Sequence, residues 1–502
     1  MIFNCNRYYS ERRIAGHFPG HVPLDVKILE NGDVYIFTKD EKQVQKNKMN
    51  TTKFTAASLI GVSAVTVAQT KPNIVLIIAD DCRFQDLGCY GSKDAVTPNI
   101  DRLAREGLKF NQFCQATAMS SPTRHCLLTG IYPVRSGAYP NHTFINDGIS
   151  TLPKYFKNAG YRVALQGKRH IAPVDAFPFE YLGDEEDHVD IEQMEPFIAD
   201  VTAKKEPFFL YVASQDPHSP WTRGDRSLFD VKKITLPPYL VDTEKTRENY
   251  VNYLAEINQF DTDVGKVDAL IKKYGLETNT VFIFTGEQGH SFPFAKWTCY
   301  DAGLQTAFII RWDGIIKPNS ITDALCEYVD VTPTLVEIAG GKIPKDLDGK
   351  SFLKVIQGRT EKFKKYAYAA HTTRGIIQGS EYYGIRSVRS DKFSYIMNLT
   401  PEAEFKNVVT TNEDEVWQSW LEKAGTDAFA RQQVTKFQHR PAEEIYDIVK
   451  DPFQMNNLIN DPQYAKEVKV MRAKLLTWMK QQGDEGQATE MKAMEHQTIN
   501  MN

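Results

Sequence analysis

Short apolar runs, each followed by polar residues, recur along this 502-residue chain. The first run is Asn73 to Ala79, and further runs lie at 161–165, 208–213, 280–285 and 307–312. Continuous apolar runs of this length are typical of strands buried on both faces. Helical patterns separate them, at 99–106, 151–159 and 248–273. Strands that alternate with helices predict an α/β fold with a mostly parallel sheet.

Groups of polar residues stand directly behind four of these runs. In chain order they contain Asp80 and Asp81, then Lys168 and His170, then His218, then Glu287, Gln288 and His290. The carboxyl ends of parallel strands share one edge of a sheet, where open α/β folds bind ligands. The sequence therefore predicts one crevice lined by carboxylates, an amide, histidines and a lysine.

The predicted crevice offers oxygen ligands for a cation. Asp80, Asp81, Glu287 and Gln288 all carry side-chain oxygens, and hard cations prefer such ligands. Ca²⁺ is therefore favoured over zinc, with Mg²⁺ also possible. A single aspartate could simply cap a helix, but two adjacent carboxylates behind a buried strand favour a metal site.

The segment from Ala118 to Gly130 predicts a helix that begins near Ser121, with Pro122 in its first turn. Ser120 would then face the amide groups at the start of the helix, which favour an anion. Taken alone, this is only a capped helix.

Near residue 370 the pattern changes. The stretch 384–397 predicts short hairpin strands, and 412–430 and 464–480 predict helices. We expect a catalytic domain over 71–370, a smaller C-terminal α+β domain with an antiparallel sheet over 371–485, and a loose polar tail over 486–502.

The beginning of the chain resembles an export signal placed late. Met49 opens a short basic start, a mildly apolar run to Ala68 and a small-residue cleavage site. We expect a signal peptide over 49–68, an upstream extension over 1–48, and a periplasmic or secreted protein. A buried helix or strand over 54–68 is the alternative. No run is long and apolar enough to predict a stable membrane span.

Composition excludes some classes of protein. The formal net charge of -4 does not suggest a nucleic-acid binder. The seven cysteines are scattered and form no CxxC pair, so a zinc site or a disulfide scaffold is not indicated.

One motif is specific to a family. Ser120-x-Pro-Thr-Arg124-x-x-Leu-x-Thr-Gly130 resembles the sulfatase signature, in its serine form. Further ordered matches, spread over about 71–480, are the opening strand with Asp80-Asp81, Thr97 to Leu103, Gly-Lys168-x-His170, Asp-Pro-His218, Lys296, Asp330 to Leu335, Glu444 to Asp447, Asp451-Pro452 and Asn457-Leu458. Within the family, Gly167 to Pro173, Asp216 to His218, Ile385 to Arg389 and Asn398-Leu399 resemble the heparan N-sulfatase branch.

The resemblance implies a fold and a chemistry. The fold would be an alkaline-phosphatase-like sandwich, and the substrate a sulfated carbohydrate such as a glycosaminoglycan-derived sugar. A maturase would oxidise Ser120 to formylglycine, an aldehyde that adds water to form a geminal diol. One hydroxyl of the diol would bind the metal together with the four oxygen ligands and attack sulfur, and the second would then expel sulfate and regenerate the aldehyde. Lys168, Lys296 and His218 would hold the sulfate, and His218 or Lys296 would protonate the leaving group. His170 would act as a base, and Arg124 would hold the nucleophile in place.

One departure and several open alternatives remain. The family has Asp followed by Asn or His where this chain has Glu287-Gln288, each side chain one methylene longer than Asp or Asn, which puts the metal geometry in doubt. His142, His290, His371 and Arg374 are further candidates for substrate contact. The alternatives are a phosphomonoesterase or phosphodiesterase of the same fold that uses Ser120 directly, and an inactive homologue that binds sulfated glycans.

Overall fold

The computed structural model describes residues 24–28, 34–38, 71–183 and 188–500. The chain forms two compact units, Met1–Ala68 and Gln69–Asn502. In the first unit, strand β1 (Leu24–Ile28) pairs antiparallel with β2 (Val34–Thr38). The predicted signal peptide lies outside the described residues.

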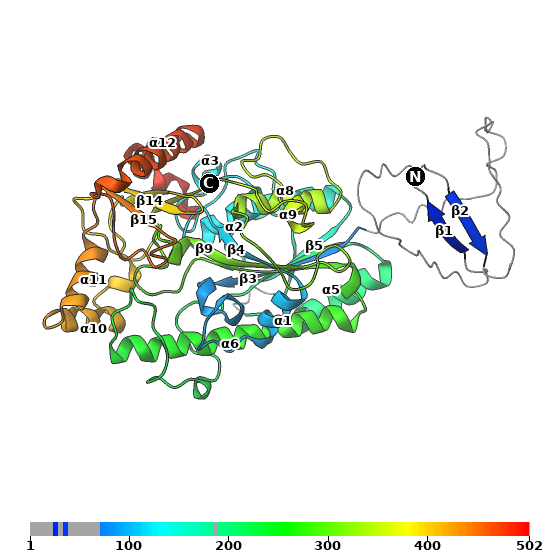
Figure 1. The fold of residues 1–502 in the computed structure, drawn as a ribbon, viewed down its shortest axis with the longest axis horizontal. Helices are drawn as coiled ribbons and strands as arrows, with labels where there is room; N and C mark the ends of the chain where they lie inside the picture. The colour runs from blue at the N-terminus through cyan, green and yellow to red at the C-terminus, as the bar shows by residue number, and fades with distance from the viewer. Residues whose placement is uncertain (1–23, 29–33, 39–70, 184–187, 501–502) are drawn as a thin grey trace. The chain divides into compact units, whose positions relative to one another are not determined.

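A nine-stranded sheet is the centre of the second unit (Figure 1). Its strand order is β10-β4-β9-β8-β3-β7-β5-β6, and β11 also pairs with β4. The strands are β3 (Asn73–Asp80), β4 (Leu108–Cys114), β5 (Arg162–Gly167), β6 (Glu180–Leu182), β7 (Phe208–Ala213), β8 (Thr280–Glu287), β9 (Gln305–Arg311), β10 (Ser320–Thr322) and β11 (Cys326–Glu327).

The prediction of a mostly parallel sheet is confirmed. Strand β9 is the exception, since it runs antiparallel to both β8 and β4. The apolar run at 307–312 was expected to belong to the parallel set. The connection from β8 to β9 contains only the four-residue helix α7 (Asp301–Leu304), so no crossover helix carries the chain back to start a parallel neighbour.

Both faces of the sheet are buried, as the apolar runs predicted. Val75 and Ile77 of β3 pack into one hydrophobic core, and Ile74 and Leu76 pack into the other, because successive side chains of a strand point to opposite faces. In Figure 1, helices α1, α5 and α6 cover one face, and α2, α8 and α9 cover the other. The result is a three-layered α/β sandwich.

The helices of the sandwich match the three predicted helical stretches and add several more. Their bounds are α1 (Pro98–Glu106), α2 (Ser120–Thr129), α3 (Pro133–Ser136), α4 (Leu152–Asn158), α5 (Ile191–Lys204), α6 (Glu244–Lys273), α8 (Val331–Ile338) and α9 (Leu353–Ile356). No helix among the described residues has the length and apolar character needed to cross a bilayer.

The C-terminal part forms a separate antiparallel sheet, as expected. Its order is β12 (Ala367–Thr372), β13 (Gly384–Arg389), β14 (Phe393–Asn398) and β15 (Glu443–Asp447). The prediction of a single helix over 412–430 is wrong, because this stretch contains parts of two helices. It contains α10 (Glu415–Ala424) and the start of α11 (Ala428–Gln438), because the Gly425–Asp427 turn interrupts the helix and Asp427 caps the next one. Helix α12 (Ala465–Gln482) matches the last predicted helix.

The expectation of a loose tail is wrong for residues 486–500. This segment contains helix α13 (Gln487–Met491) and packs against the rest of the unit. Glu490 is fully buried, with Oε1 2.8 Å from Nη2 of Arg386. The backbone N–H of Thr498 donates to the carbonyl of His142 at 2.7 Å. The polar composition of this segment suggested a loose tail, because composition alone does not show that its polar groups form buried ion pairs and backbone hydrogen bonds.

Candidate active site

The metal-ligand candidates meet where two central strands end. Strands β3 and β8 pair in parallel register, which places Asp80 opposite Glu287. Asp81 and Gln288 follow directly, and both adopt the left-handed backbone conformation, with φ of 64° and 41°. This conformation is uncommon for residues other than glycine and turns the chain sharply at the sheet edge. All four side chains are buried.

Ser120 lies in the middle of this group as the first residue of α2. Its hydroxyl donates to Oδ1 of Asp80 at 2.8 Å and accepts a hydrogen bond from the Gln288 amide at 2.7 Å. The same amide nitrogen lies 2.9 Å from Oδ1 of Asp81. The helix and the two strand ends therefore place the predicted nucleophile within hydrogen-bond distance of two candidate ligands, Asp80 and Gln288, and the Gln288 amide in turn contacts Asp81.

Three cationic or protonatable side chains surround the two aspartates. Nζ of Lys296 lies 2.7 Å from Oδ2 of Asp81, and Lys168 forms an ion pair with Asp80. Nε2 of His218 lies 3.7 Å from Oδ2 of Asp81. Burial alone would raise the pKa of Asp80, but the charges of Lys168, His218, Arg124 and Lys296 outweigh it and hold that pKa well below its usual value.

Arg124, one helical turn beyond Ser120, contacts Glu287. Its Nη2 and Nε lie 2.8 and 3.1 Å from the same oxygen, Oε1, and Nη2 lies 3.6 Å from Oδ2 of Asp80. Burial raises the pKa of Glu287, whereas the charge of Arg124 at 2.8 Å acts in the opposite direction and favours the ionised carboxylate. Glu287 is thus oriented by Arg124 as well as by its place at the strand end.

The residues present fit a hard cation. Donor atoms of Asp80, Asp81 and His218 all lie within 4.8 Å of one another. Oε2 of Glu287 and Oε1 of Gln288 are buried oxygens that no hydrogen bond satisfies within the described part of the chain. A half-turn of the Gln288 amide exchanges its nitrogen and oxygen, and would present Oε1 to a cation held by the two aspartates. Glu287 and Gln288 stay predictions as ligands.

Two histidines lie beside this cluster. His170 follows β5 on the same loop as Lys168, and His142 lies on the loop before α4. Nε2 of His170 is 3.2 Å from Nδ1 of His142. Burial and then Lys168 lower the pKa of both rings. The structure therefore brings His142 to the site through His170.

Two of the substrate-contact candidates, His290 and His371, are enclosed by protein and stay predictions. His290 is fully buried, with Nε2 3.0 Å from the hydroxyl of Tyr239, and burial lowers its pKa to about 4. His371 lies in β12, is 1% exposed, and has a pKa lowered to about 3, by burial and then by Arg440 and Arg386.

Arg374 stays a prediction. Its guanidinium lies 3.7 Å from the centre of the Tyr382 ring and pairs with Glu381 at 3.2 Å. Its carbonyl accepts a hydrogen bond from the N–H of Asn141, the residue before His142, at 3.1 Å. The loop from the C-terminal sheet thus lies next to the His142 segment.

The sequence did not predict two further residues that contact the site, Ser291 and His125. The hydroxyl of Ser291 donates to Oδ2 of Asp81 at 2.5 Å. The position of Ser291, four residues after Glu287, could have suggested this contact. His125 is fully buried in α2, and its Nε2 accepts a hydrogen bond from the N–H of Ala172 at 2.9 Å. His125 therefore ties the helix of Ser120 to the loop of Lys168 and His170. No sequence signal marks that contact.

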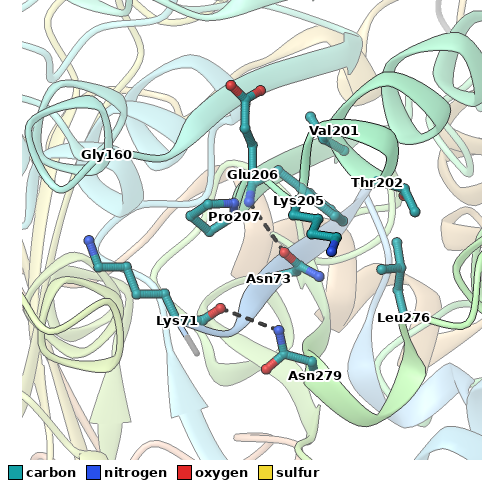
Figure 2. A pocket seen from close by; sticks show the side chains of 11 residues that line it. Lys71, Asn73, Gly160, Val201, Thr202, Lys205, Glu206, Pro207, Leu276 and Asn279 are labelled. Carbon is teal, nitrogen blue, oxygen red and sulfur yellow. Dashed lines mark hydrogen bonds between the residues drawn. The ribbon is translucent and has the colours of Figure 1, made fainter. Parts of the chain in front are cut away.

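A pocket of about 490 Å³ lies elsewhere, at the beginnings of the parallel strands. Figure 2 shows Asn73 of β3 beside Lys71, Lys205 and Pro207 in its wall. The carbonyl of Lys71 accepts a hydrogen bond from Asn279 at 3.3 Å. Ser120, Lys168, Lys296 and the histidines predicted for the active site are not among its lining residues. This pocket is therefore distinct from the candidate active site.

Comparison with known proteins agrees with this geometry. The family model for sulfatases matches residues 72–341, and the model described as N-sulphoglucosamine sulphohydrolase, C-terminal, matches residues 286–417. An ulvan-active sulfatase of Formosa agariphila is 32% identical over 430 residues, covering 82% of this chain and 81% of the relative. Human N-sulphoglucosamine sulphohydrolase is 24% identical, covering 81% and 89% of the two chains.

Solved structures share the fold. One is described as a complex with its substrate D-glucosamine-2-N,6-O-disulfate; it has a TM-score of 0.63 and 21% identity, and the match covers 83% of this chain and 99% of the other. A 2-O glycosaminoglycan sulfatase has a TM-score of 0.62 and 20% identity, with 83% and 94% covered. Together with the family model and the 32% identical relative, the arrangement around Ser120 leads to one conclusion: the chain belongs to the sulfatase family.

Proposed function

We propose that this sulfatase removes sulfate from a sulfated carbohydrate through a formylglycine made from Ser120 and a bound divalent cation, with Ca²⁺ as the first choice. The observation that carries the proposal is the position of Ser120. It begins a helix and lies 2.8 Å from Asp80 and 2.7 Å from Gln288, while Lys168 and Lys296 pair with the two aspartates.

The cation would be held by Asp80, Asp81 and Gln288, with the side chain at 120 and Glu287 as further oxygen donors. When present, the cation and the formylglycine supply an oxygen nucleophile at neutral pH and a group that can release sulfate afterwards. Arg124 is fully buried behind Ser120 and fixes the first turn of α2 through its bond to Glu287.

The residues around Ser120 suit an anionic substrate. The amide groups at the start of α2 favour a negative charge, and Lys168 and Lys296 can contact sulfate oxygens as charge builds up on them. Burial and then Lys296 lower the pKa of His218. A bound sulfate acts in the opposite direction, so substrate binding favours the protonated ring that the leaving oxygen needs.

The sugar class rests on the relatives. The relative from Formosa agariphila is named an ulvan-active sulfatase, and the human relative is an N-sulphoglucosamine sulphohydrolase. The C-terminal family model covers the β12–β14 region that follows the catalytic layers. These matches support a sulfated polysaccharide or a glycosaminoglycan-derived sugar, with either N- or O-linked sulfate.

Peptide mass spectrometry across Ser120 tests the proposal, on protein produced with a serine-competent maturase. We expect the loss of two hydrogens, an aldehyde that a hydrazine reagent traps, and release of sulfate from a panel of ulvan, heparan and N-acetylglucosamine-6-sulfate substrates. Unmodified serine in an active protein would instead favour direct attack by Ser120 on a phosphate ester. Unmodified serine in an inactive, glycan-binding protein would favour the binding-only alternative.

We also propose that the chain is exported, with translation starting at Met49 and cleavage after Ala68. The basic start at Met49, the apolar run to Ala68 and the small residues before Gln69 support this proposal. N-terminal sequencing of the secreted protein tests it. A mature chain that begins upstream of Met49 would contradict it.

A further inference from the structure

The histidine pair joins a buried ring nitrogen to solvent. Nε2 of His170 lies 3.2 Å from Nδ1 of His142, and the ring centres are 5.0 Å apart. His142 is exposed. The other ring nitrogen of His170, Nδ1, is buried and has no hydrogen-bond partner within the described part of the chain. A neutral His170 with its proton on Nε2 donates to His142 and leaves Nδ1 free to accept a proton.

Both histidines adopt an unfavourable backbone conformation. The φ angles of His142 and His170 are 53° and 47°, and residues other than glycine keep this left-handed conformation only where the surrounding structure enforces it. A strained pair whose side chains meet is typical of a functional contact rather than of two ordinary loop residues.

The nucleophile helix and the C-terminal tail fix the two loops. The hydroxyl of Ser121 accepts a hydrogen bond from the N–H of Thr143 at 3.2 Å, and Thr498 donates to the carbonyl of His142 at 2.7 Å. His125 binds the N–H of Ala172, two residues beyond His170. The separation of the two rings is therefore set from both sides.

Hydrolysis of an O-linked sulfate ester, the case to which this inference applies, must release a proton. The overall reaction is ROSO₃⁻ + H₂O → ROH + SO₄²⁻ + H⁺, because sulfate is fully ionised at neutral pH. One proton has to reach solvent in each turnover. The proposed base, His170, has its free nitrogen buried, so it needs a route by which that proton can leave.

We propose that His142 is a proton relay between His170 and solvent, an inference that rests on the proposed function. A proton from the reacting hydroxyl is taken up at Nδ1 of His170, and the proton on Nε2 passes to Nδ1 of His142. His142 then gives its Nε2 proton to water. Each ring gains one proton and loses one, so the pair returns to its starting charge with its tautomers exchanged, and rotation or re-equilibration with water restores them.

The charges around the two histidines favour rapid release of a proton from the pair to water. Lys168, Arg124 and Asp80 face His170, and after burial the two cations lower the pKa of its ring. Lys168 also faces His142 and lowers its pKa in the same direction after burial. A proton that arrives on the pair is therefore passed on to water rather than retained at neutral pH.

The test compares His142→Ala and His142→Gln with His439→Gln, which alters an exposed histidine of α11's C-cap outside the site. We expect kcat for a sulfated sugar to fall about 10-fold in both His142 variants, below the ~10²–10⁴ of a group that transfers a proton to or from the substrate itself. KM should change less than twofold. Added imidazole should restore kcat in His142→Ala, and the control should match the wild type.

A second measurement does not depend on turnover. Nitrogen-15 spectra of the histidines in the full chain, with Ser120 unmodified, should show His170 protonated on Nε2 in the wild type. His142→Ala should shift that equilibrium, while His439→Gln should not.

The outcomes separate the two proposals. A raised KM with no rescue of kcat by imidazole would overturn the relay and make His142 a substrate-binding residue. A His142→Ala enzyme with unchanged kcat, or a wild-type His170 that carries no proton on Nε2, would also overturn it. Absence of sulfatase activity in a wild type whose formylglycine has been verified would overturn the proposed function, and the relay with it.

Discussion

Arg124 and Glu287 form an ion pair in which neither side chain is exposed to solvent, with Nη2 2.8 Å from Oε1. The pair joins the first turns of α2 to the end of β8, and so connects the helix of Ser120 to the strand that Gln288 directly follows. This ion pair therefore helps to fix the positions of Ser120 and Gln288 relative to each other.

The first prediction concerns this pair. Glu287→Ala should lower the free energy of unfolding by about 3–5 kcal/mol, because it leaves a buried guanidinium without its partner. Urea denaturation followed by circular dichroism measures the change. The exposed pair of Lys204 and Asp200 provides the control, and Lys204→Ala should leave stability nearly unchanged. Equal effects of the two substitutions would show that Arg124 is satisfied by other groups.

The second prediction concerns the cation. Ca²⁺ at a hundredfold excess over its dissociation constant should stabilise the wild type by about 2.7 kcal/mol. Asp81→Asn and Gln288→Leu should each weaken this stabilisation, because they remove oxygen donors from the cluster around Ser120. Thermal unfolding with and without a chelator measures it.

Glu381→Gln is the matched control for the cation test, since Glu381 is exposed and its ion pair within the described part of the chain is with Arg374. It should keep the full calcium response. A calcium response that survives in both Asp81→Asn and Gln288→Leu would place the cation elsewhere in the molecule.

The third prediction is a pH dependence. Burial lowers the pKa of His371 to about 3 in the folded protein, whereas the ring has its ordinary pKa of about 6.5 in the unfolded chain. Between these two pH values only the unfolded chain binds the proton. The stability contributed by neutral His371 is fully present above pH 6.5 and is lost as pH falls toward 3, by about 2 kcal/mol at pH 5. His371→Leu should remove that part of the acid sensitivity.

The same substitution should cost little at neutral pH. Both ring nitrogens of His371 are buried without a hydrogen-bond partner in the described residues, so replacing the ring with an apolar side chain leaves no new unsatisfied group. Unfolding free energies of wild type and His371→Leu at pH 5 and pH 7.5 give the comparison. If the free energy of unfolding falls equally in the two proteins between pH 7.5 and pH 5, His371 does not contribute to the acid sensitivity.

The fourth prediction concerns Lys296, which is 3% exposed and lies 2.7 Å from Asp81. Lys296→Met should lower kcat/KM by about 10²–10³, as expected when one preorganised donor to a developing charge is lost. Lys296→Arg should recover part of it. Lys354→Met, at an exposed lysine of α9, should have wild-type kinetics. Full activity of Lys296→Met would remove Lys296 from the sulfate-binding set.

The sequence predicted best where one physical rule dominates. The apolar runs ending at Ala79 and Thr285 gave two buried parallel strands, and the polar residues behind them meet at one edge because parallel strands end together. The direction of β9 could not be predicted, since an apolar run is equally apolar in either direction. Strand β4 was missed because Lys109, Asn111 and Gln112 interrupt its apolar pattern.

Contacts between distant segments escaped prediction for a related reason. His290 and Asp81 follow neighbouring strands, yet only the structure places the aromatic residues of α6 and Tyr239 around the His290 ring. His125 looked like any residue within a motif until its bond to Ala172 was known. Such pairings depend on the packed fold, and one sequence carries no local pattern for them.

The ordered C-terminal segment bears on how the enzyme should be produced. Because Thr498 holds the carbonyl of His142 and Glu490 is buried against Arg386, the segment 487–500 supports a loop of the candidate active site. An affinity tag fused there, or trimming by a protease, would disturb catalysis in a protein that otherwise remains folded. Low specific activity of such a preparation would then report damage at the carboxyl terminus rather than incomplete oxidation of Ser120.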